Sequence, residues 1–177
     1  MKLPDFLGLA RRDPPLELLL IGGYAVAVHG HTRATFDVDF MIRRADLSAW
    51  KARLLGAGLV LYAERTGFAQ FTQPAGGDGL DLMLVDDRTF QLMQSTALEA
   101  DFDGAKTGVP SLDNLLALKL HVLRQALPYR TGKDAEDVEM LLRRNKLPLE
   151  SEHYRNLFLK YGDGKLYETF LRILRHD

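Results

Sequence analysis

The chain contains no cysteine, no long apolar run and no excess of charge of either sign. Without cysteine there is no disulfide framework, no thiolate nucleophile and no cysteine-ligated zinc, so any metal must be held by carboxylates or by the five histidines. No stretch approaches the roughly 18 consecutive apolar residues of a membrane span, and residues 1–5 lack the apolar core of a signal peptide. We therefore expect a cytoplasmic protein with no membrane partner.

The near balance of charge argues against a surface that coats nucleic acid. The 24 acidic and 23 basic side chains leave a net charge of −1, so no blanket positive field exists. Hydrophobic residues make up 46% of the 177 residues, which is enough for one packed core with a small appendage and excludes a disordered or fibrous chain.

The first 110 residues show mainly strand patterns, punctuated by glycine. A short apolar run ends at Gly22-Gly23 and is followed by a short helix, and Asp103-Gly104 is a favourable hairpin dipeptide. The predicted strands are 16–21, 36–42, 59–63, 68–72, 80–85, 98–102 and 105–109, and the predicted helices are 24–29, 46–55 and 89–94. From residue 111 helices follow one another, at 112–127, 133–144, 150–160 and 165–175. These patterns predict an α+β body over residues 1–110 and a helical part over 111–177.

Three aspartates stand out on the predicted strands. Asp37 and Asp39 are two residues apart and project from one face, where they repel each other unless a cation bridges them. If the strand that bears Asp81 is a neighbour, the three carboxylates are suited to two magnesium ions and to displacement at phosphorus. The alternative is a strand that carries aspartate only because one face is in water.

The pair Gly22-Gly23 lies where a strand turns into a helix. Backbone N–H groups at such a turn accept a triphosphate without obstruction from a Cβ, although a tight turn alone would also need glycine. The pair precedes Asp37 by 15 and 14 residues, which is short enough to bring a phosphate cradle and the acidic face together.

The sequence around the glycine pair and the first two aspartates resembles a known family. The segments Gly22-Gly23-Tyr24-Ala25-Val26-Ala27-Val28-His29-Gly30 and Arg33-Ala34-Thr35-Phe36-Asp37-Val38-Asp39 are similar to the core motif of DNA polymerase β-like nucleotidyltransferases. The Gly-Gly variant with Arg-x-Thr-x-Asp-x-Asp resembles the abortive-infection toxins of the AbiEii type. The resemblance extends over about residues 17–145, through Asp81, Lys119 and the segment 130–138. It implies a mixed sheet flanked by helices.

The resemblance also implies roles for individual residues. Asp37, Asp39 and Asp81 would be catalytic ligands of Mg²⁺ or Mn²⁺, with Asp81 also a base for the incoming hydroxyl. Gly22, Gly23, Arg33 and Asp134 would bind the nucleotide, and Lys119 would both bind it and neutralise the leaving pyrophosphate. Each of these residues also has a purely structural alternative. Lys119 and Arg33 would then be solvated side chains, Thr131-x-x-Asp134 would be a helix-capping box, and Asp137 would be structural.

The sequence therefore predicts a metal-dependent nucleotidyltransferase that moves a nucleoside monophosphate from a triphosphate to a hydroxyl. The resemblance suggests RNA, such as a tRNA end, or a protein as acceptor, a role as a toxin in bacterial defence, and an antitoxin partner. The doublets Arg11-Arg12, Arg43-Arg44 and Arg143-Arg144 would form an RNA-binding rim if they converged. The alternatives are a small-molecule, antibiotic-type nucleotidyltransferase and a non-catalytic module that binds a nucleotide or a partner.

Overall fold

A computed structural model of the protein describes residues 1–125 and 128–175, with side chains for residues 1–125 and 132–175. These residues form two compact units. The sheet unit comprises Met1–Val28 and Arg33–Ser111, and the helical unit comprises His29–Thr32 and Leu112–Asp177. Within the described residues, no helix has both the length and the apolar character that a membrane crossing requires.

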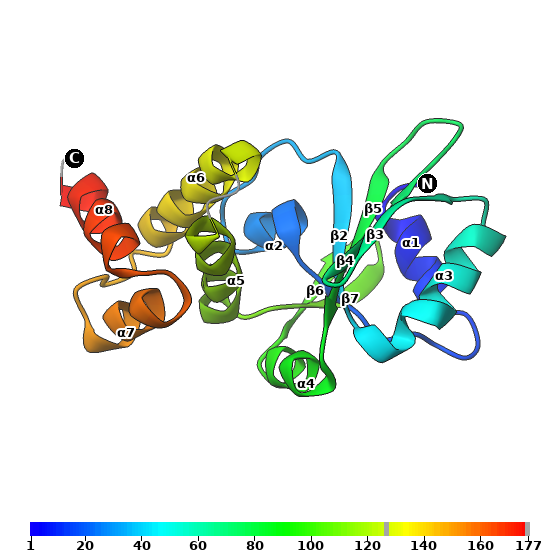
Figure 1. Ribbon diagram of the computed structural model, residues 1–177, viewed down its shortest axis with the longest axis horizontal. Coiled ribbons are helices and arrows are strands. Elements are labelled where there is room, and N and C mark those ends of the chain that lie inside the picture. Colours follow the sequence, from blue (N-terminus) through cyan, green and yellow to red (C-terminus); the bar gives the residue numbers. More distant parts are fainter. Residues whose placement is uncertain (126–127, 176–177) are drawn as a thin grey trace. The chain divides into compact units, whose positions relative to one another are not determined.

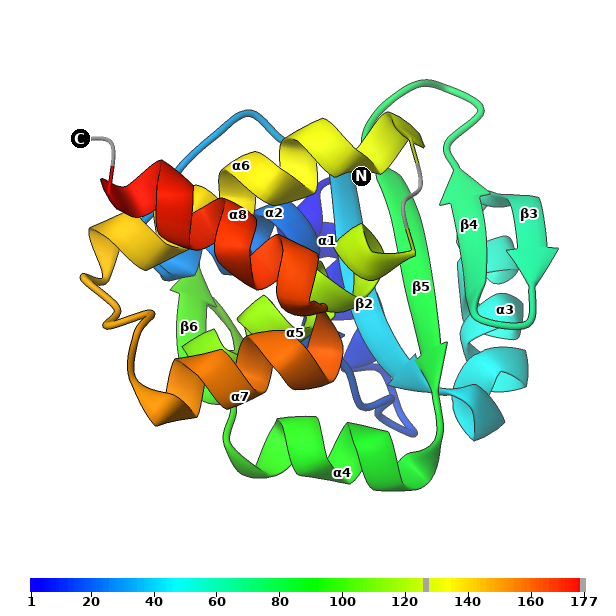
Figure 2. The ribbon, with the colours of Figure 1, turned by 60° about the vertical axis from the view of Figure 1, so that its left-hand side comes forward.

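The sheet unit is built on a mixed five-stranded sheet. Its strands are β1 (Leu19–Leu20), β2 (Asp37–Arg43), β3 (Val60–Arg65), β4 (Phe68–Thr72) and β5 (Gly79–Val85). They lie in the order β1-β2-β5-β4-β3, in which β2 and β5 are parallel and the other pairs are antiparallel. Figure 2 shows β2 and β5 side by side, with β4 and β3 beyond them. The chain therefore leaves β2, builds the β3–β4 hairpin at the edge and returns to the centre as β5.

Helices cover the two faces of this sheet unequally. Figure 1 shows α1 (Leu3–Ala10) and α3 (Leu47–Gly56) on one side and α2 (Gly22–Val28) on the other. The core under α3 contains Trp50 and Phe40, both fully buried, with ring centroids 5.8 Å apart. The remaining elements are the 3₁₀ turn η1 (Arg44–Asp46), α4 (Asp87–Ser95) and the hairpin of β6 (Leu98–Phe102) and β7 (Ala105–Val109).

Two parts of the sheet unit differ from the sequence-based expectation. The strand predicted over 16–21 pairs only at Leu19 and Leu20, because Gly22 already begins α2. Helix α1 was not predicted, since it is short and contains both Pro4 and Gly8, which are weak helix formers. Its stability comes from burial of Leu3, Phe6, Leu7 and Leu9 against the rest of the unit.

The helical unit contains α5 (Leu112–Arg124), α6 (Pro128–Arg144), α7 (Glu152–Tyr161) and α8 (Gly164–Arg175). Leu116, Leu120, Phe158 and Phe170 form part of its core. The helix predicted to start at Lys133 starts instead at Pro128, where proline fits because the first helical residue needs no N–H partner. The end predicted for the preceding helix, at residue 127, lies outside the described residues.

Candidate active site

Three of the predicted site residues lie on one face of the sheet unit. Asp37 and Asp39 alternate on β2 with buried apolar residues, and Asp81 alternates in the same way on β5. The parallel register places Asp39 directly beside Asp81 and Asp37 beside Gly79. Because side chains at alternate positions share a face, the structure brings the three carboxylates together on two adjacent strands.

Gly22 lies directly against one of these carboxylates. A Cβ at this position would be 1.9 Å from Oδ2 of Asp39, and the residue has a φ of +62°. Both observations require glycine, since no L side chain fits the space and few adopt that backbone conformation. The turn from β1 into α2 therefore brings bare backbone next to the acidic face.

Gly23 and Arg33 meet on the same side of the unit. A Cβ on Gly23 would lie 2.7 Å from Oγ1 of Thr35 and 3.2 Å from Nη1 of Arg33. The Arg33 guanidinium also donates to the carbonyl of Ala34 at 3.2 Å. The loop that leads into β2 thus folds over the glycine turn, and Gly22, Gly23 and Arg33 gather where β2 begins.

The oxygens of these three carboxylates are suited to a hard divalent cation, although they are not yet close enough together to hold one. Carboxylate oxygens are the ligands that Mg²⁺ and Mn²⁺ prefer, and three of them face one way on neighbouring strands. Among residues 1–125 and 132–175, no three His, Asp or Glu side chains are already close enough together to hold an ion. Metal binding would therefore require the carboxylate oxygens to come closer together, which a strand separation of about 4.8 Å allows.

Tyr24, which follows the glycine pair, does not provide a proton acceptor. Burial raises the pKa of its hydroxyl above the ordinary value of 10.0, and the negative charge of Asp78 raises it further. Its ring packs edge-on against Phe102 at 5.8 Å. At neutral pH Tyr24 therefore stays protonated.

The structure adds one polar residue that the sequence analysis did not single out. Gln70 stands opposite Asp81 on β4, and its Nε2 donates to Oδ2 of Asp81 at 2.9 Å. Its neighbours Ala69 and Phe71 are buried on the other face of the sheet. A polar residue between two buried ones on a predicted strand was a visible signal, but its partner depends on the strand order.

Lys119 and Asp134 lie in the helical unit, where they belong to a buried ion cluster. The Lys119 ammonium on α5 is 2.6 Å from Oδ1 of Asp134 and 2.7 Å from Oδ2 of Asp137, both on α6. All three side chains are buried, Asp137 completely. Two of the three ammonium hydrogens are therefore directed at carboxylates, and the cluster joins α5 to α6.

The capping interpretation of Asp134 is wrong. Helix α6 begins at Pro128, three residues before Thr131, so Asp134 lies inside the helix and not in its first turn. The side chain of Thr131 lies outside the described residues. The spacing of Asp134 and Asp137, three apart on one helical face, was the signal that could have revealed a shared partner.

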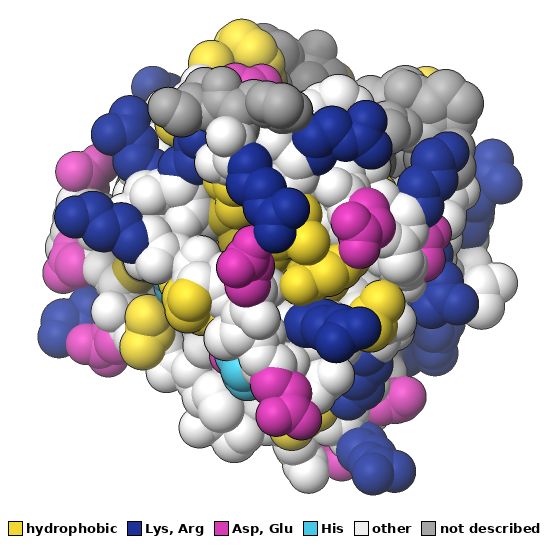
Figure 3. All heavy atoms as spheres, turned by 90° about the vertical axis from the view of Figure 1, so that its left-hand side faces the viewer, with side chains coloured by type: hydrophobic (Ala, Val, Ile, Leu, Met, Phe, Trp, Pro, Cys, Tyr) yellow, Lys and Arg dark blue, Asp and Glu magenta, His cyan; other side chains and the backbone are white. Residues whose placement is uncertain are grey.

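The arginine doublets are largely occupied within the molecule. Arg43 forms ion pairs with Glu17 and with Asp87, the latter at 2.7 Å. Arg44 donates to the carbonyls of Thr66 and Leu84, Arg11 to that of Lys106, and Arg143 to Glu139 and to the carbonyl of Ile173. On the face drawn in Figure 3, basic side chains alternate with acidic and hydrophobic ones and form no continuous basic surface.

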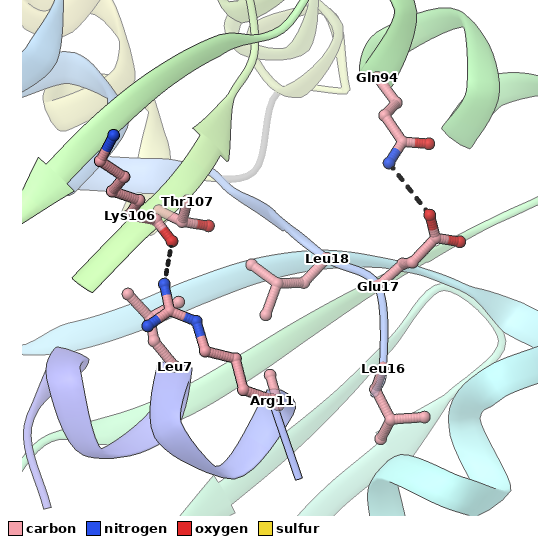
Figure 4. A pocket seen from close by; sticks show the side chains of 9 residues that line it. Leu7, Arg11, Leu16, Glu17, Leu18, Gln94, Lys106 and Thr107 are labelled. Carbon is pink, nitrogen blue, oxygen red and sulfur yellow. Dashed lines mark hydrogen bonds between the residues drawn. The ribbon is translucent and has the colours of Figure 1, made fainter. Parts of the chain in front are cut away.

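A pocket of about 200 Å³ lies elsewhere in the sheet unit, between α1, the segment before β1, α4 and β7. Figure 4 shows Gln94 donating to Glu17 and Arg11 donating to the carbonyl of Lys106 across it. Glu17 also pairs with Arg43 at the far end of β2 from Asp37. Because these polar groups are bonded to each other, the pocket offers no chemistry comparable to the carboxylate face.

Comparison with known proteins bears on the fold. No protein-family model and no curated protein matches the sequence. Solved structures do match: the crystal structure of ANT(2'')-Ia in complex with adenylyl-2''-tobramycin has a TM-score of 0.65 and 17% identity over 88% of this chain and 91% of that one. The lincomycin-bound lincosamide antibiotic adenylyltransferase LnuA has a TM-score of 0.57 and 16% identity, over 80% of this chain and 96% of that one. An antigenic nucleotidyltransferase-like protein from Paracoccidioides brasiliensis has a TM-score of 0.55 and 15% identity, over 96% of this chain and 90% of that one.

These likenesses, at identities of 15 to 17%, concern the arrangement of the backbone. They confirm the predicted fold class, a mixed sheet flanked by helices in an α+β chain. The protein therefore has the nucleotidyltransferase fold.

Proposed function

We propose that the protein is a divalent-metal-dependent nucleotidyltransferase that transfers a nucleoside monophosphate from a nucleoside triphosphate to a hydroxyl. The observation that carries the proposal is the gathering of Asp37, Asp39 and Asp81 on one face of two adjacent strands, next to the Gly22-Gly23 turn. A purely structural role does not explain three acids with one orientation, because like charges at this spacing repel.

In this proposal Asp37, Asp39 and Asp81 would hold Mg²⁺ or Mn²⁺. When bound, the metal supplies positive charge that offsets the charge on the phosphate oxygens. Asp81 accepts the proton of the acceptor hydroxyl, whose oxygen forms a bond to the α-phosphorus. The bond from that phosphorus to the bridging oxygen breaks, and pyrophosphate leaves.

The glycine turn and its loop provide the phosphate side of the site. The backbone N–H of Gly23 donates to the triphosphate, and the neighbouring Arg33 guanidinium adds positive charge. Lys119 as the residue that neutralises pyrophosphate and Asp134 as a nucleotide ligand rest on the family resemblance alone. Their ion cluster with Asp137 makes them equally suited to holding the helical unit together.

Two classes of acceptor follow from two different likenesses. The motifs of AbiEii type favour RNA, such as a tRNA end, or a protein, and thus a toxin with an antitoxin partner. The fold neighbours favour a small molecule with hydroxyl groups, since ANT(2'')-Ia was captured with an adenylylated tobramycin and LnuA with lincomycin. The net charge of −1 and the occupied arginine doublets add support for the small molecule.

Labelled nucleotide distinguishes these alternatives. The protein is incubated with each α-³²P-labelled nucleoside triphosphate, Mg²⁺ and a cell extract divided by ultrafiltration into small and large molecules. The matched control carries Asp37→Asn and Asp39→Asn, which keep the size of both side chains. Label on a small molecule supports the antibiotic-type acceptor, and label on RNA or protein supports the toxin. Nucleotide binding without transfer by the parent protein supports the non-catalytic module and contradicts the enzyme.

A further inference from the structure

We infer that Gln70 is a positioning residue that fixes the orientation of the Asp81 carboxylate. This inference rests on the proposed function, because it assigns Gln70 the task of holding a catalytic ligand in place. Neither the motifs nor the fold likeness assigns a role to this residue.

The first step is the direction of the contact. The Nε2 of Gln70 lies 2.9 Å from Oδ2 of Asp81. An ionised carboxylate only accepts hydrogen bonds, so the amide nitrogen of Gln70, and not its oxygen, faces Asp81. The contact is therefore a charge-assisted hydrogen bond with one chemically required orientation.

The second step is the rigidity of the donor. Gln70 is the register partner of Asp81 across the antiparallel pair β4–β5, and Asp81 is in turn the register partner of Asp39 across β5–β2. The residues on either side of Gln70, Ala69 and Phe71, are buried on the opposite face. The backbone thus holds Gln70 in a row with the two carboxylates.

The third step is the choice of a neutral donor. A lysine or arginine at this position would neutralise Asp81 and compete with a cation for its oxygens, whereas a leucine would remove this hydrogen bond from the carboxylate. A primary amide restrains one oxygen and leaves the negative charge of the residue unchanged. This is the role that outer contacts commonly play at metal-binding carboxylates.

The test compares Gln70→Leu with the parent protein, and Thr72→Val serves as the matched control because Thr72 lies two residues further along β4 and is exposed. Mn²⁺ affinity is measured by electron paramagnetic resonance without nucleotide, and kcat and KM are measured for transfer. Gln70→Leu is expected to weaken Mn²⁺ binding and lower kcat by about 10- to 100-fold, with KM for the triphosphate little changed. Thr72→Val should change neither quantity.

A double-mutant cycle separates positioning from a general structural effect. In an Asp81→Asn protein the charged acceptor is missing, so adding Gln70→Leu should not weaken Mn²⁺ binding further. Equal losses from Gln70→Leu in both backgrounds, or a fully active Gln70→Leu, would overturn the inference. Gln70→Met repeats the test with an unbranched side chain if the leucine variant melts early. A fully active Asp81→Asn protein would instead contradict the proposed function itself, so the two failures are distinguishable.

Discussion

The ammonium nitrogen of Lys119 lies 2.7 Å from a carboxylate oxygen of Asp137, the one fully buried acid among the described residues. Asp134 approaches the same nitrogen to 2.6 Å. The cluster therefore consists of a lysine on α5 between two aspartates that are three residues apart on α6. Charges buried in this way are stable only as long as each has its partner.

The first prediction concerns the stability of this cluster. Lys119→Ala leaves two buried carboxylates without their cation, and it should lower the free energy of unfolding by about 3 to 5 kcal/mol. Urea denaturation followed by circular dichroism measures the change. Lys133→Ala, which removes an exposed lysine from α6, the helix that carries both aspartates, is the control and should change stability little.

The size of this loss decides how the phosphate role of Lys119 is tested. The family resemblance implies that removal of Lys119 affects use of the triphosphate, but alanine would also disturb the helical unit. Lys119→Arg keeps a cation between the aspartates. Loss of nucleotide affinity in a Lys119→Arg protein of unchanged stability would support a phosphate contact that needs the lysine ammonium.

A second prediction follows from Gly22. Gly22→Ala places a methyl group on top of the Asp39 carboxylate and forces alanine into a positive φ. It should cost at least about 1 kcal/mol of stability and abolish transfer, because Asp39 must move. Gly67→Ala is the control, since nothing lies within 4 Å of its Cβ position. An active, stable Gly22→Ala protein would contradict the proposed packing of the site.

The candidate site could be foreseen only in part. Alternation along a strand is local, so the sequence alone predicted that Asp37 and Asp39 share a face. The pairing of Asp39 with Asp81 depends on β5 returning beside β2 after the β3–β4 hairpin, and no local pattern encodes that order. Gln70 was missed for the same reason, because its contact with Asp81 depends on β4 lying next to β5.

The same division applies to the helices. Periodicity and glycine located the helices near residues 46–55 and 165–175, since the apolar residues of these helices recur at helical spacing in the sequence. Helix α1 has poor propensity and forms because Phe6 and Leu7 are buried and the helix packs against β7, far along the chain. Helix α6 starts earlier than predicted because proline, which breaks a helix interior, suits the first helical turn.

The third prediction concerns acid. Hydrogen bonds from Arg43, then from Gln94, hold the pKa of Glu17 below its ordinary value of 4.5. Because the folded state holds this proton less tightly, stability from Glu17 is present above pH 4.5 and is lost as pH falls through the lowered pKa. Glu17→Gln should therefore flatten the decline in melting temperature below pH 4.5 relative to the parent. The measurement is thermal denaturation between about pH 5 and about pH 3, which spans the ordinary glutamate pKa. An unchanged slope of melting temperature against pH in Glu17→Gln would contradict the prediction.

The last prediction concerns Arg53, which closes the end of α1. Its Nη1 lies 3.1 Å from the carbonyl of Leu9 and 3.2 Å from that of Ala10, and its Nη2 donates to Pro14 at 2.8 Å. A planar guanidinium donates to these carbonyls together, which the single ammonium of lysine does not. Its positive charge also interacts favourably with the negative end of the helix dipole. Arg53→Lys and Arg53→Ala should both lower the free energy of unfolding, by about 1 to 3 kcal/mol, and should speed amide exchange within Leu3–Ala10. Ser48→Ala, at an exposed position of the same helix α3, provides the baseline. Full protection of α1 in the Arg53→Lys protein would mean that charge alone, without the forked geometry, is enough to hold that helix end.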